Sequence, residues 1–335
     1  MKYFLWYIGG ICLLSLGGFV LPVNAQVGDN QPVRRYVEQE VQKKTEKRQK
    51  RSGACGYTKP MKVAGFVTNP PFGWVDVIPG DRTRPDMYFN DGFAYQLFYN
   101  MATQLGLKVE NKGFTSYHAA LTALKKGEID VLVGSYYDKR TLGVGTSILF
   151  PSYIKNPIVV MFMMGKEKDV KSLEDLKGLK GGVRQEEMIY SLLYDSLPEG
   201  VQMEQIAGSK EAYSRLMLGK IDYLITSLYA AESEIRRFKI TDKVVLTRVP
   251  LMEPELFFVF SSNSPCRLLK PTFEEQLRKE RDNGGSIGNL LFEHVDKWAD
   301  RFRYEEPLTD ILSKTIAPKM PEKAADIPVA VPSMP

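Results

Sequence analysis

Along residues 60–300, short runs of consecutive apolar residues alternate with segments in which apolar residues recur about every four positions. The short apolar run Lys62–Val67 predicts a buried strand that ends at a Pro-Pro turn. In Phe93–Leu105 apolar residues return every four positions, which predicts a helix that ends before Gly106. Further strands are predicted at 107–109, 129–133, 157–164, 181–183, 223–226 and 256–261, and further helices at 117–124, 187–197, 211–218, 273–281 and 287–298. Strands that alternate with helices predict an α/β fold with two sheets.

One local pattern occurs twice along the chain. Leu124–Arg140 reads LKKGEIDVLVGSYYDKR, and Leu218–Ser227 reads LGKIDYLITS. In both, the end of a helix runs into Gly, a charged residue, Ile-Asp and an apolar strand, which predicts two α/β lobes of like construction. Two of the predicted strands cross between the lobes, so the second lobe is inserted into the first. A ligand bound between the lobes would close them about a hinge near Asn156–Val160 and Phe257–Ser261.

The first 25 residues have the layout of a secretory signal peptide. A basic start at Lys2 precedes the largely apolar stretch Phe4–Val20, and Val23–Ala25 matches a small-residue cleavage site before Gln26. The alternative, an uncut membrane anchor, is disfavoured because glycines interrupt an already short apolar run. We therefore expect a periplasmic mature protein without a transmembrane span.

The net charge of +5 is concentrated near the N-terminus. Residues 26–59 hold nine lysine and arginine residues against four acidic ones, so the remainder of the chain is close to neutral. This distribution does not favour a nucleic-acid partner. It indicates a solvated charged linker over 26–59, and the Pro- and Ala-rich composition of 306–335 predicts an extended C-terminal tail.

Cysteine usage fits an oxidising compartment. Cys12 belongs to the predicted signal peptide, which leaves Cys55 and Cys266 as candidates for one disulfide; two isolated thiols are the alternative. With only two histidines and no CxxC motif, neither a zinc site nor another cofactor is expected.

Taken in order, six segments resemble the family 3 extracellular solute-binding proteins, the periplasmic receptors that deliver polar amino acids to ABC importers. The segments are KVAGFVTNPPFGW, DGFAYQLFYNMATQLGLKVE, YHAALTALKKGEIDVLVGSYYDKR, KSLEDLKGLKGGV, LMLGKIDYLITS and DNGGSIGNLLFEHVDKW. The resemblance implies a two-lobed, type II periplasmic-binding-protein-like fold, and a monomer that hands a small polar solute to an ABC permease. With the crossing strands, it places the first lobe at 60–156 and 258–305 and the second lobe at 157–257.

The resemblance also implies a ligand site on the first lobe. Arg140 and Ser135 fall where the family holds the ligand's α-carboxylate, and a guanidinium with a hydroxyl suits that group chemically. Tyr117 falls where the family places an aromatic side chain against the ligand. Phe72 and Trp74 follow the Pro-Pro turn and are expected near the rim of the cleft, although large apolar residues suit a core equally well.

Several positions depart from the family site. Asn69 stands where the family has an aromatic residue, and Ser227 stands where it has the aspartate that binds the α-ammonium group. The loop that normally offers backbone donors to the carboxylate reads Arg184–Glu187, with acids at Glu186 and Glu187. These acids either receive a cationic group of the ligand or lie exposed at a helix start. The sequence therefore favours a small polar, carboxylate-bearing solute over a standard α-amino acid.

Two other functional classes fit the sequence less well. An enzyme would need a convergent acid–base pair, and Glu186, Glu187 and Asp138 form no recognisable arrangement. A periplasmic accessory protein that binds a partner and has lost its solute is the stronger alternative, because the basic linker, the Pro-rich tail and the altered second lobe all suit it. A tight small ligand discriminates between the two, since a receptor has one and an accessory protein needs none.

Overall fold

The computed structural model describes residues 55–81, 83, 86–138, 142–283 and 285–316, together with positions 35, 39, 40, 42, 43 and 46. The chain divides into two compact units, residues 1–47 and 48–335. The described positions of the first unit are helical. The predicted signal peptide and Arg140 lie outside the described residues. Within the described part of the chain, no helix is long and apolar enough to cross a membrane.

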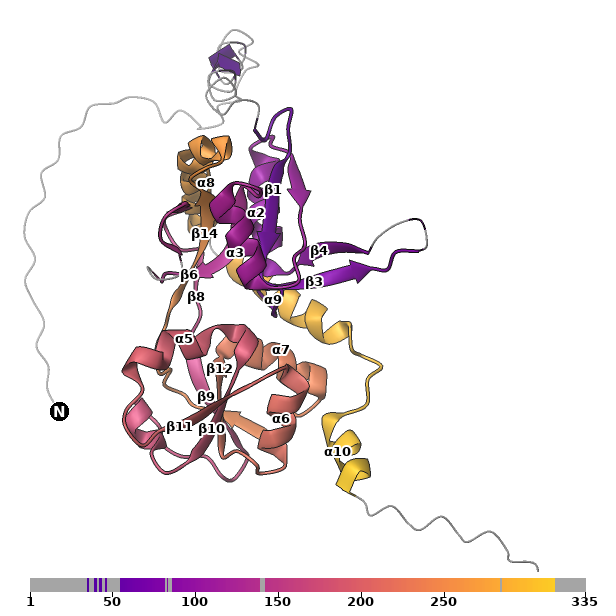
Figure 1. Ribbon diagram of the computed structural model, residues 1–335, viewed down its shortest axis with the longest axis vertical. Helices are drawn as coiled ribbons and strands as arrows, with labels where there is room; N and C mark the ends of the chain where they lie inside the picture. Colours follow the sequence, from indigo (N-terminus) through magenta and orange to yellow (C-terminus); the bar gives the residue numbers. More distant parts are fainter. Residues whose placement is uncertain are drawn as a thin grey trace, which may run out of the picture. The chain divides into compact units, whose positions relative to one another are not determined.

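The first lobe is built on a six-stranded sheet with the order β5-β1-β6-β14-β7, in which β8 also pairs with β14 (Figure 1). Strand β1 is parallel to β5 and β6, whereas β14 runs antiparallel to β6, β7 and β8. The strands are β1 (Met61–Gly65), β5 (Val109–Asn111), β6 (Val131–Tyr136), β7 (Thr146–Ile148), β8 (Ile154–Lys155) and β14 (Glu255–Ser261). One face is covered by α2 (Phe93–Gln104) and α8 (Lys270–Asp282), and the other by α3 (Tyr117–Lys126).

Local sequence explains how these elements begin and end. The side chain of Ser116 accepts a hydrogen bond from the N–H of Ala119 and so caps α3, and Gly127 ends that helix with a φ of 79°. All six residues of β6 are buried, as expected for a strand with helices on both faces of its sheet. The rings of Phe98 and Phe273 stack with centroids 4.6 Å apart and join α2 to α8.

The second lobe is built on a five-stranded sheet with the order β11-β10-β12-β9-β13 (Figure 1). Strand β10 is parallel to β11 and β12, and β9 is antiparallel to β12 and β13. The strands are β9 (Ile158–Met163), β10 (Lys180–Arg184), β11 (Gln202–Ile206), β12 (Tyr223–Ser227) and β13 (Val244–Leu246). Helices α6 (Ser209–Met217) and α7 (Leu228–Phe238) cover one face, and α5 (Ile189–Leu193) packs on the other. Short 3-10 helices are η1 (Leu173–Leu176), η2 (Gln185–Glu187) and η3 (Tyr194–Ser196).

The repeated Gly-x-Ile-Asp pattern has the same structural role in both lobes. Asp130 Oδ2 accepts a hydrogen bond from the backbone N–H of Lys62 at 2.7 Å, and Asp222 Oδ2 accepts one from that of Lys180 at 2.8 Å. Each aspartate precedes one parallel strand and fastens the start of its neighbour, β1 in the first lobe and β10 in the second. The two lobes are therefore alike, as predicted, in that an aspartate before one parallel strand holds the start of the adjacent strand.

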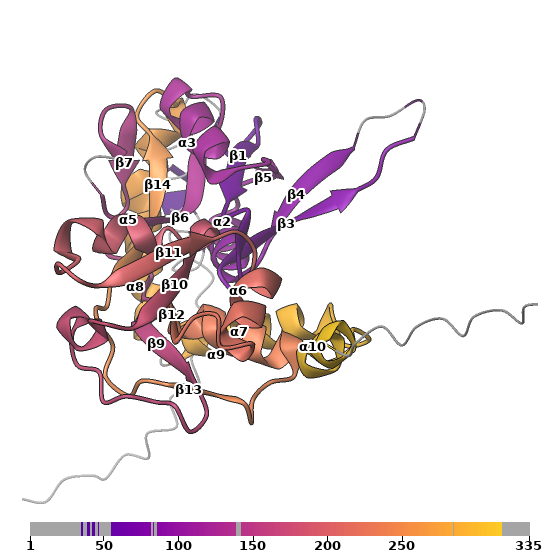
Figure 2. The same cartoon turned by 60° about the horizontal axis from the view of Figure 1, so that its bottom comes forward.

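A three-stranded sheet, β2-β3-β4, follows β1 and extends from the first lobe as an arm (Figure 2). Its strands are β2 (Thr68–Asn69), β3 (Gly73–Ile78) and β4 (Met87–Asp91). Gly92 has a φ of 118°, and a Cβ there would come within 2.6 Å of the Cα of Gly73, so only glycine permits this close approach. The last described elements are α9 (Ser286–Asp300) and α10 (Leu308–Ile316).

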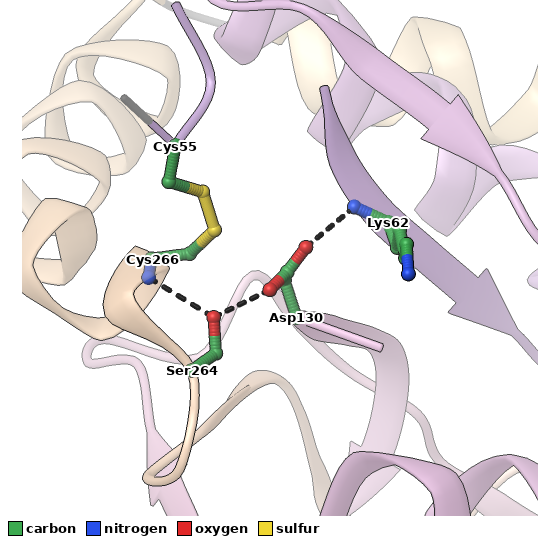
Figure 3. The surroundings of a disulfide bond; sticks show 5 residues. All are labelled: Cys55, Lys62, Asp130, Ser264 and Cys266. Carbon is green, nitrogen blue, oxygen red and sulfur yellow. Dashed lines mark hydrogen bonds between the residues drawn. A yellow bond between two sulfur atoms is a disulfide. The ribbon is translucent and has the colours of Figure 1, made fainter. Parts of the chain in front are cut away.

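A disulfide joins Cys55 to Cys266, as the sequence predicted (Figure 3). Cys55 lies before β1, and Cys266 lies in the 3-10 helix η4 (Pro265–Leu269). Ser264 Oγ accepts a hydrogen bond from the N–H of Cys266 at 3.0 Å and donates one to Asp130, which in turn holds β1. The disulfide and these hydrogen bonds thus fasten the first strand of the lobe to a segment more than 200 residues later, since the two cysteines are 211 positions apart.

The structure differs from the predicted elements in several places. The helix predicted over 187–197 is divided into η2, α5 and η3. Met188, which separates η2 from α5, adopts a left-handed conformation with a φ of 60°. Part of the predicted extended tail is the helix α10. The arm, α7 and the strands β7, β8, β11 and β13 were not predicted by the apolar spacing. The lobe boundaries given above remain predictions.

Candidate functional site

The two lobes touch at the carboxyl ends of their parallel strands. Strand β2 lies against η2, and the rings of Phe72 and Tyr229 meet edge to face with centroids 6.0 Å apart. Met188, Leu192 and Tyr229 of the second lobe pack against the core cluster of the first. We call this region the interlobe face; it comprises Asn69, Phe72, Met188, Leu192, Ser227 and Tyr229.

On the first lobe, two of the predicted ligand residues bond to each other. The phenol of Tyr117 donates to Ser135 Oγ at 2.8 Å, and Ser135 Oγ donates to the carbonyl of Tyr136 at 3.0 Å. Because a hydroxyl has one proton, Ser135 has none left to offer a ligand in this arrangement. Burial raises the pKa of Tyr117 to about 12, so its phenol remains a neutral donor. Phe66 stacks on Tyr117 with ring centroids 5.8 Å apart.

Tyr136 brings the first lobe within electrostatic reach of the second. Its hydroxyl accepts a hydrogen bond from Asn156 Nδ2 at 2.7 Å. Burial, followed by the negative charge of Glu187, raises the pKa of Tyr136. The charge of Glu187, in the second lobe, therefore acts on Tyr136 at the end of β6 in the first lobe.

In the second lobe, Arg184 is the centre of a buried charge network. Its Nε lies 2.6 Å from Glu187 Oε1, and its Nη1 lies 3.2 Å from Glu234 Oε1. The side chains of all three residues are only 1% exposed. Ser209 Oγ accepts from Arg184 and donates to Glu234 at 2.7 Å. Burial opposes the charged guanidinium, but the attraction of the two carboxylates outweighs it and raises the pKa of Arg184.

The carboxylate of Glu187 accepts hydrogen bonds from the donor groups at the carboxyl ends of β10 and β12. It accepts the backbone N–H of Ser227 at 2.9 Å and the hydroxyl of Thr226 at 2.9 and 3.1 Å, in addition to Arg184. An N–H, a hydroxyl and a guanidinium are the groups that would bind the acid group of a solute. Glu187 is therefore neither an exposed helix-start acid nor free to receive a ligand cation. Glu186, its neighbour, accepts the N–H of Gly208 at 2.9 Å.

Two buried polar side chains of the interlobe face lack a protein partner among the described residues. Asn69, from the first lobe, is 1% exposed, and neither its amide nitrogen nor its amide oxygen is hydrogen-bonded. Ser227, from the second lobe, is fully buried, and its Oγ is likewise without a partner. A buried polar group without a hydrogen bond costs about 1–3 kcal/mol. These two groups are therefore the places where a small polar molecule would find complementary atoms.

The two aromatic residues predicted at the cleft rim have different positions. Phe72 lies on the interlobe face against Tyr229. Trp74 instead packs on α9, with ring centroids 5.2 Å from Trp298 and 6.3 Å from His294. Trp74 is thus part of a buried aromatic cluster, the alternative that the sequence had left open for it.

The sequence did not identify Thr226, Glu234, Met188 or Tyr229 as site residues. One signal was present for the charge network: Arg184 directly follows a run predicted as a buried strand, and a charge at that place needs a partner. Its partner Glu234 lies 50 positions later, and no local spacing links the two.

Neither a protein-family model nor a curated protein matches this chain. Solved structures do. AbpA, an amino acid ABC transporter substrate-binding protein from Streptococcus pneumoniae bound to L-arginine, is 16% identical, with 72% of this chain and 95% of that one covered and a TM-score of 0.55. A histidine kinase sensor domain with similarity to periplasmic binding proteins is 19% identical, with 70% and 95% covered and a TM-score of 0.54.

The GluR0 ligand-binding core in complex with L-glutamate is 18% identical, with 72% of this chain and 97% of that one covered and a TM-score of 0.53. The fold is that of the two-lobed periplasmic binding proteins. The fold class predicted from the sequence is thereby confirmed. At these identities the likeness concerns the fold alone, and the similar proteins include a transporter's substrate-binding protein, a ligand-binding core and a kinase sensor domain.

Proposed function

We propose that this chain is an exported, periplasmic solute receptor that holds a small polar, carboxylate-bearing solute at the interlobe face and delivers it to an ABC importer. The observation that carries the proposal is the pair of buried, unpartnered groups on Asn69 and Ser227, which come from opposite lobes. A solute that bonds to both stabilises the closed arrangement of the lobes, because neither group is satisfied by the protein itself.

The charge network narrows the class of solute. Because Glu187 already fills the donors at Ser227 and Thr226, the second lobe cannot bind the carboxylate of a standard α-amino acid there. It also lacks the aspartate that would bind an α-ammonium group, since that position is Ser227. In this proposal the solute's acid group turns to Arg140 of the first lobe, and its neutral polar part reaches Asn69 and Ser227.

A first test is thermal unfolding of the mature protein with amino acids, opines and small carboxylates, after native mass spectrometry for a co-purified molecule. We expect one solute class to raise the melting temperature to saturation, because a ligand bound only by the native state stabilises it. Ser227→Ala and Asn69→Ala should each weaken binding about tenfold or more through the loss of one hydrogen bond to a buried ligand. Thr241→Ala, an exposed position, is the matched control.

Arg140→Ala should weaken binding of the same solute by about 2–4 kcal/mol, because the solute's carboxylate loses its charged partner. Isothermal titration calorimetry of the native protein and the variant measures this difference directly. Lys139→Ala removes an equal charge from the adjacent position and should change the affinity much less. An Arg140→Ala protein with an unchanged dissociation constant would show that the acid group is bound elsewhere.

The second candidate is a periplasmic accessory protein that binds a partner rather than a solute. It is favoured by the same Glu187, since an acid of the chain itself takes the position of a ligand, and by Met188, Leu192 and Tyr229, which already pack against the first lobe. No bound molecule and no thermal shift across the panel would support this candidate over the receptor.

A further inference from the structure

The last described segment of the chain contacts both lobes. Helix α9 packs against α2 and α8 of the first lobe and against α7 of the second, and α10 packs against α6 (Figure 2). We call residues 296–312 the strap. This segment begins within α9, runs through a turn over 301–305 and ends in α10.

Two ion pairs and an aromatic contact fix the strap to the first lobe. Arg301 Nη1 donates to Asp76 Oδ2 of β3 at 2.8 Å, and Lys297 Nζ lies 2.8 Å from Asp91 Oδ2 at the end of β4. The ring of Trp298 packs on Trp74 of β3. These contacts attach the beginning of the strap to the arm.

A second set of contacts, all from the end of α7, fixes the strap to the second lobe. The guanidinium of Arg237 lies 3.7 Å from the ring centroid of Phe302, and its Nε lies 3.6 Å from Glu305 Oε2. Lys239 Nζ donates to the carbonyls of Arg303 and Glu305 at 3.0 and 2.6 Å. Lys239 has a φ of 56°, the left-handed conformation that ends α7 at this point.

The end of the strap is buried in the second lobe. Leu308 is fully buried within the cluster formed by α6, α7 and their sheet, and Leu312 packs against the same cluster. Arg236 of α7 forms a further ion pair with Asp296. The strap is thus held on both sides of the interlobe face by charged, aromatic and aliphatic contacts.

The charge network of the second lobe is connected to the strap through Arg237. From Ser227 on the interlobe face, the path runs through Glu187, Arg184 and Glu234, whose Oε2 lies 3.5 Å from Arg237 Nη1. Arg237 therefore has one carboxylate in the network, Glu234, and one in the strap, Glu305. The attachment of the strap shares a cation with the network that fills the second-lobe site.

We propose that the strap is a conformational latch: it holds the two lobes together without a solute, and its release from α7 lets the interlobe face open. The proposal does not rest on the receptor function, because every contact that carries it is made by the chain itself. The lobes of this protein are then closed at rest, and opening requires that Arg237, Lys239 and Leu308 lose their contacts together.

Hydrogen–deuterium exchange of the full-length mature protein tests the latch. Leu308→Asp should detach the strap, because a carboxylate cannot remain buried in an apolar cluster. Peptides over 66–75 and 184–193, which contain four of the six residues of the interlobe face, should then exchange about tenfold faster or more, whereas β6 and residues 223–226 of β12 keep their protection. Lys171→Ala removes an exposed second-lobe charge that pairs with Asp169 outside the strap; it is the control and should leave all these rates unchanged.

Leu308→Asp also disturbs the apolar core of the second lobe, so a second variant alters the strap at the surface only. Asp296→Asn removes one of two surface carboxylates beside Arg236, because Glu232 stays 3.9 Å from its Nε, and should speed exchange of the same two segments by a smaller factor. Unchanged exchange at the interlobe face in both variants would overturn the latch. A uniform rise across both sheets in both variants would also overturn it, because the strap would then support folding rather than closure.

Discussion

Replacing Glu187 by alanine is expected to lower the free energy of unfolding by about 3–5 kcal/mol, the usual cost of removing one partner from a buried ion pair. The substitution takes the carboxylate from Arg184, from the hydroxyl of Thr226 and from the N–H of Ser227 at once. Glu234 remains beside the guanidinium, but it is already shared with Ser209 and Arg237. A buried positive charge and two buried donors are therefore left short of acceptors.

Urea unfolding followed by circular dichroism measures this loss. The matched control is Glu204→Ala in the same lobe, which removes a carboxylate 2.9 Å from Arg215. Because the side chain of Glu204 is 48% exposed, its ion pair is screened and should contribute less than about 1 kcal/mol. Equal losses in the two variants would mean that burial does not strengthen the Arg184–Glu187 pair.

The same variant provides a direct test of the proposed role of Glu187 as an internal ligand. Alanine leaves space beside Arg184 and Ser227, so acetate should rebind there and recover part of the lost stability. Chloride at the same ionic strength is the control for general salt effects. The native protein should gain nothing beyond that control, since its own carboxylate fills the site. Equal responses of both proteins to acetate would contradict the assignment.

The fold was open to prediction because its signals are local. Apart from Lys62 in β1 and Ser135 in β6, the runs that became these two strands lack polar side chains other than the terminal Tyr136. The Ile-Asp pairs at Asp130 and Asp222 mark strand starts whose side chains hold the neighbouring strand. A short, nearly continuous apolar run indicates a segment that is buried on both faces. A strand between two layers of helices is buried in this way, so such runs predict strands.

The second-lobe site was not predictable in the same way. The partners of Glu187 at Thr226 and Ser227 lie 39 and 40 positions away, and they meet it only because β10 and β12 are neighbours in register. The predicted helix over 187–197 failed for a related reason. Met188 takes a left-handed backbone that its residue type does not favour, and its side chain packs against the first lobe, so a tertiary contact overrides local propensity.

Removing the disulfide is expected to lower the free energy of unfolding by about 4–5 kcal/mol. Cys55 and Cys266 are 211 positions apart, and in the chain-entropy account a longer closed loop restricts the unfolded chain more. The measurement is urea unfolding of the native protein with and without a phosphine reductant, beside the Cys55→Ala/Cys266→Ala double variant. Reductant should lower the stability of the native protein toward that of the variant and should not change the variant itself.

The size of the loss distinguishes two ways of holding the first strand. Besides the disulfide, β1 is fastened by the chain of hydrogen bonds from Cys266 through Ser264 and Asp130 to Lys62. Those hydrogen bonds exist only in the folded state. The disulfide also acts on the unfolded chain, because it keeps Cys55 and Cys266 together there. A double variant as stable as the native protein would mean that the hydrogen bonds alone hold β1 in place. Ser264→Ala would then become the destabilising substitution, whereas in the presence of the disulfide it should cost only about 1 kcal/mol.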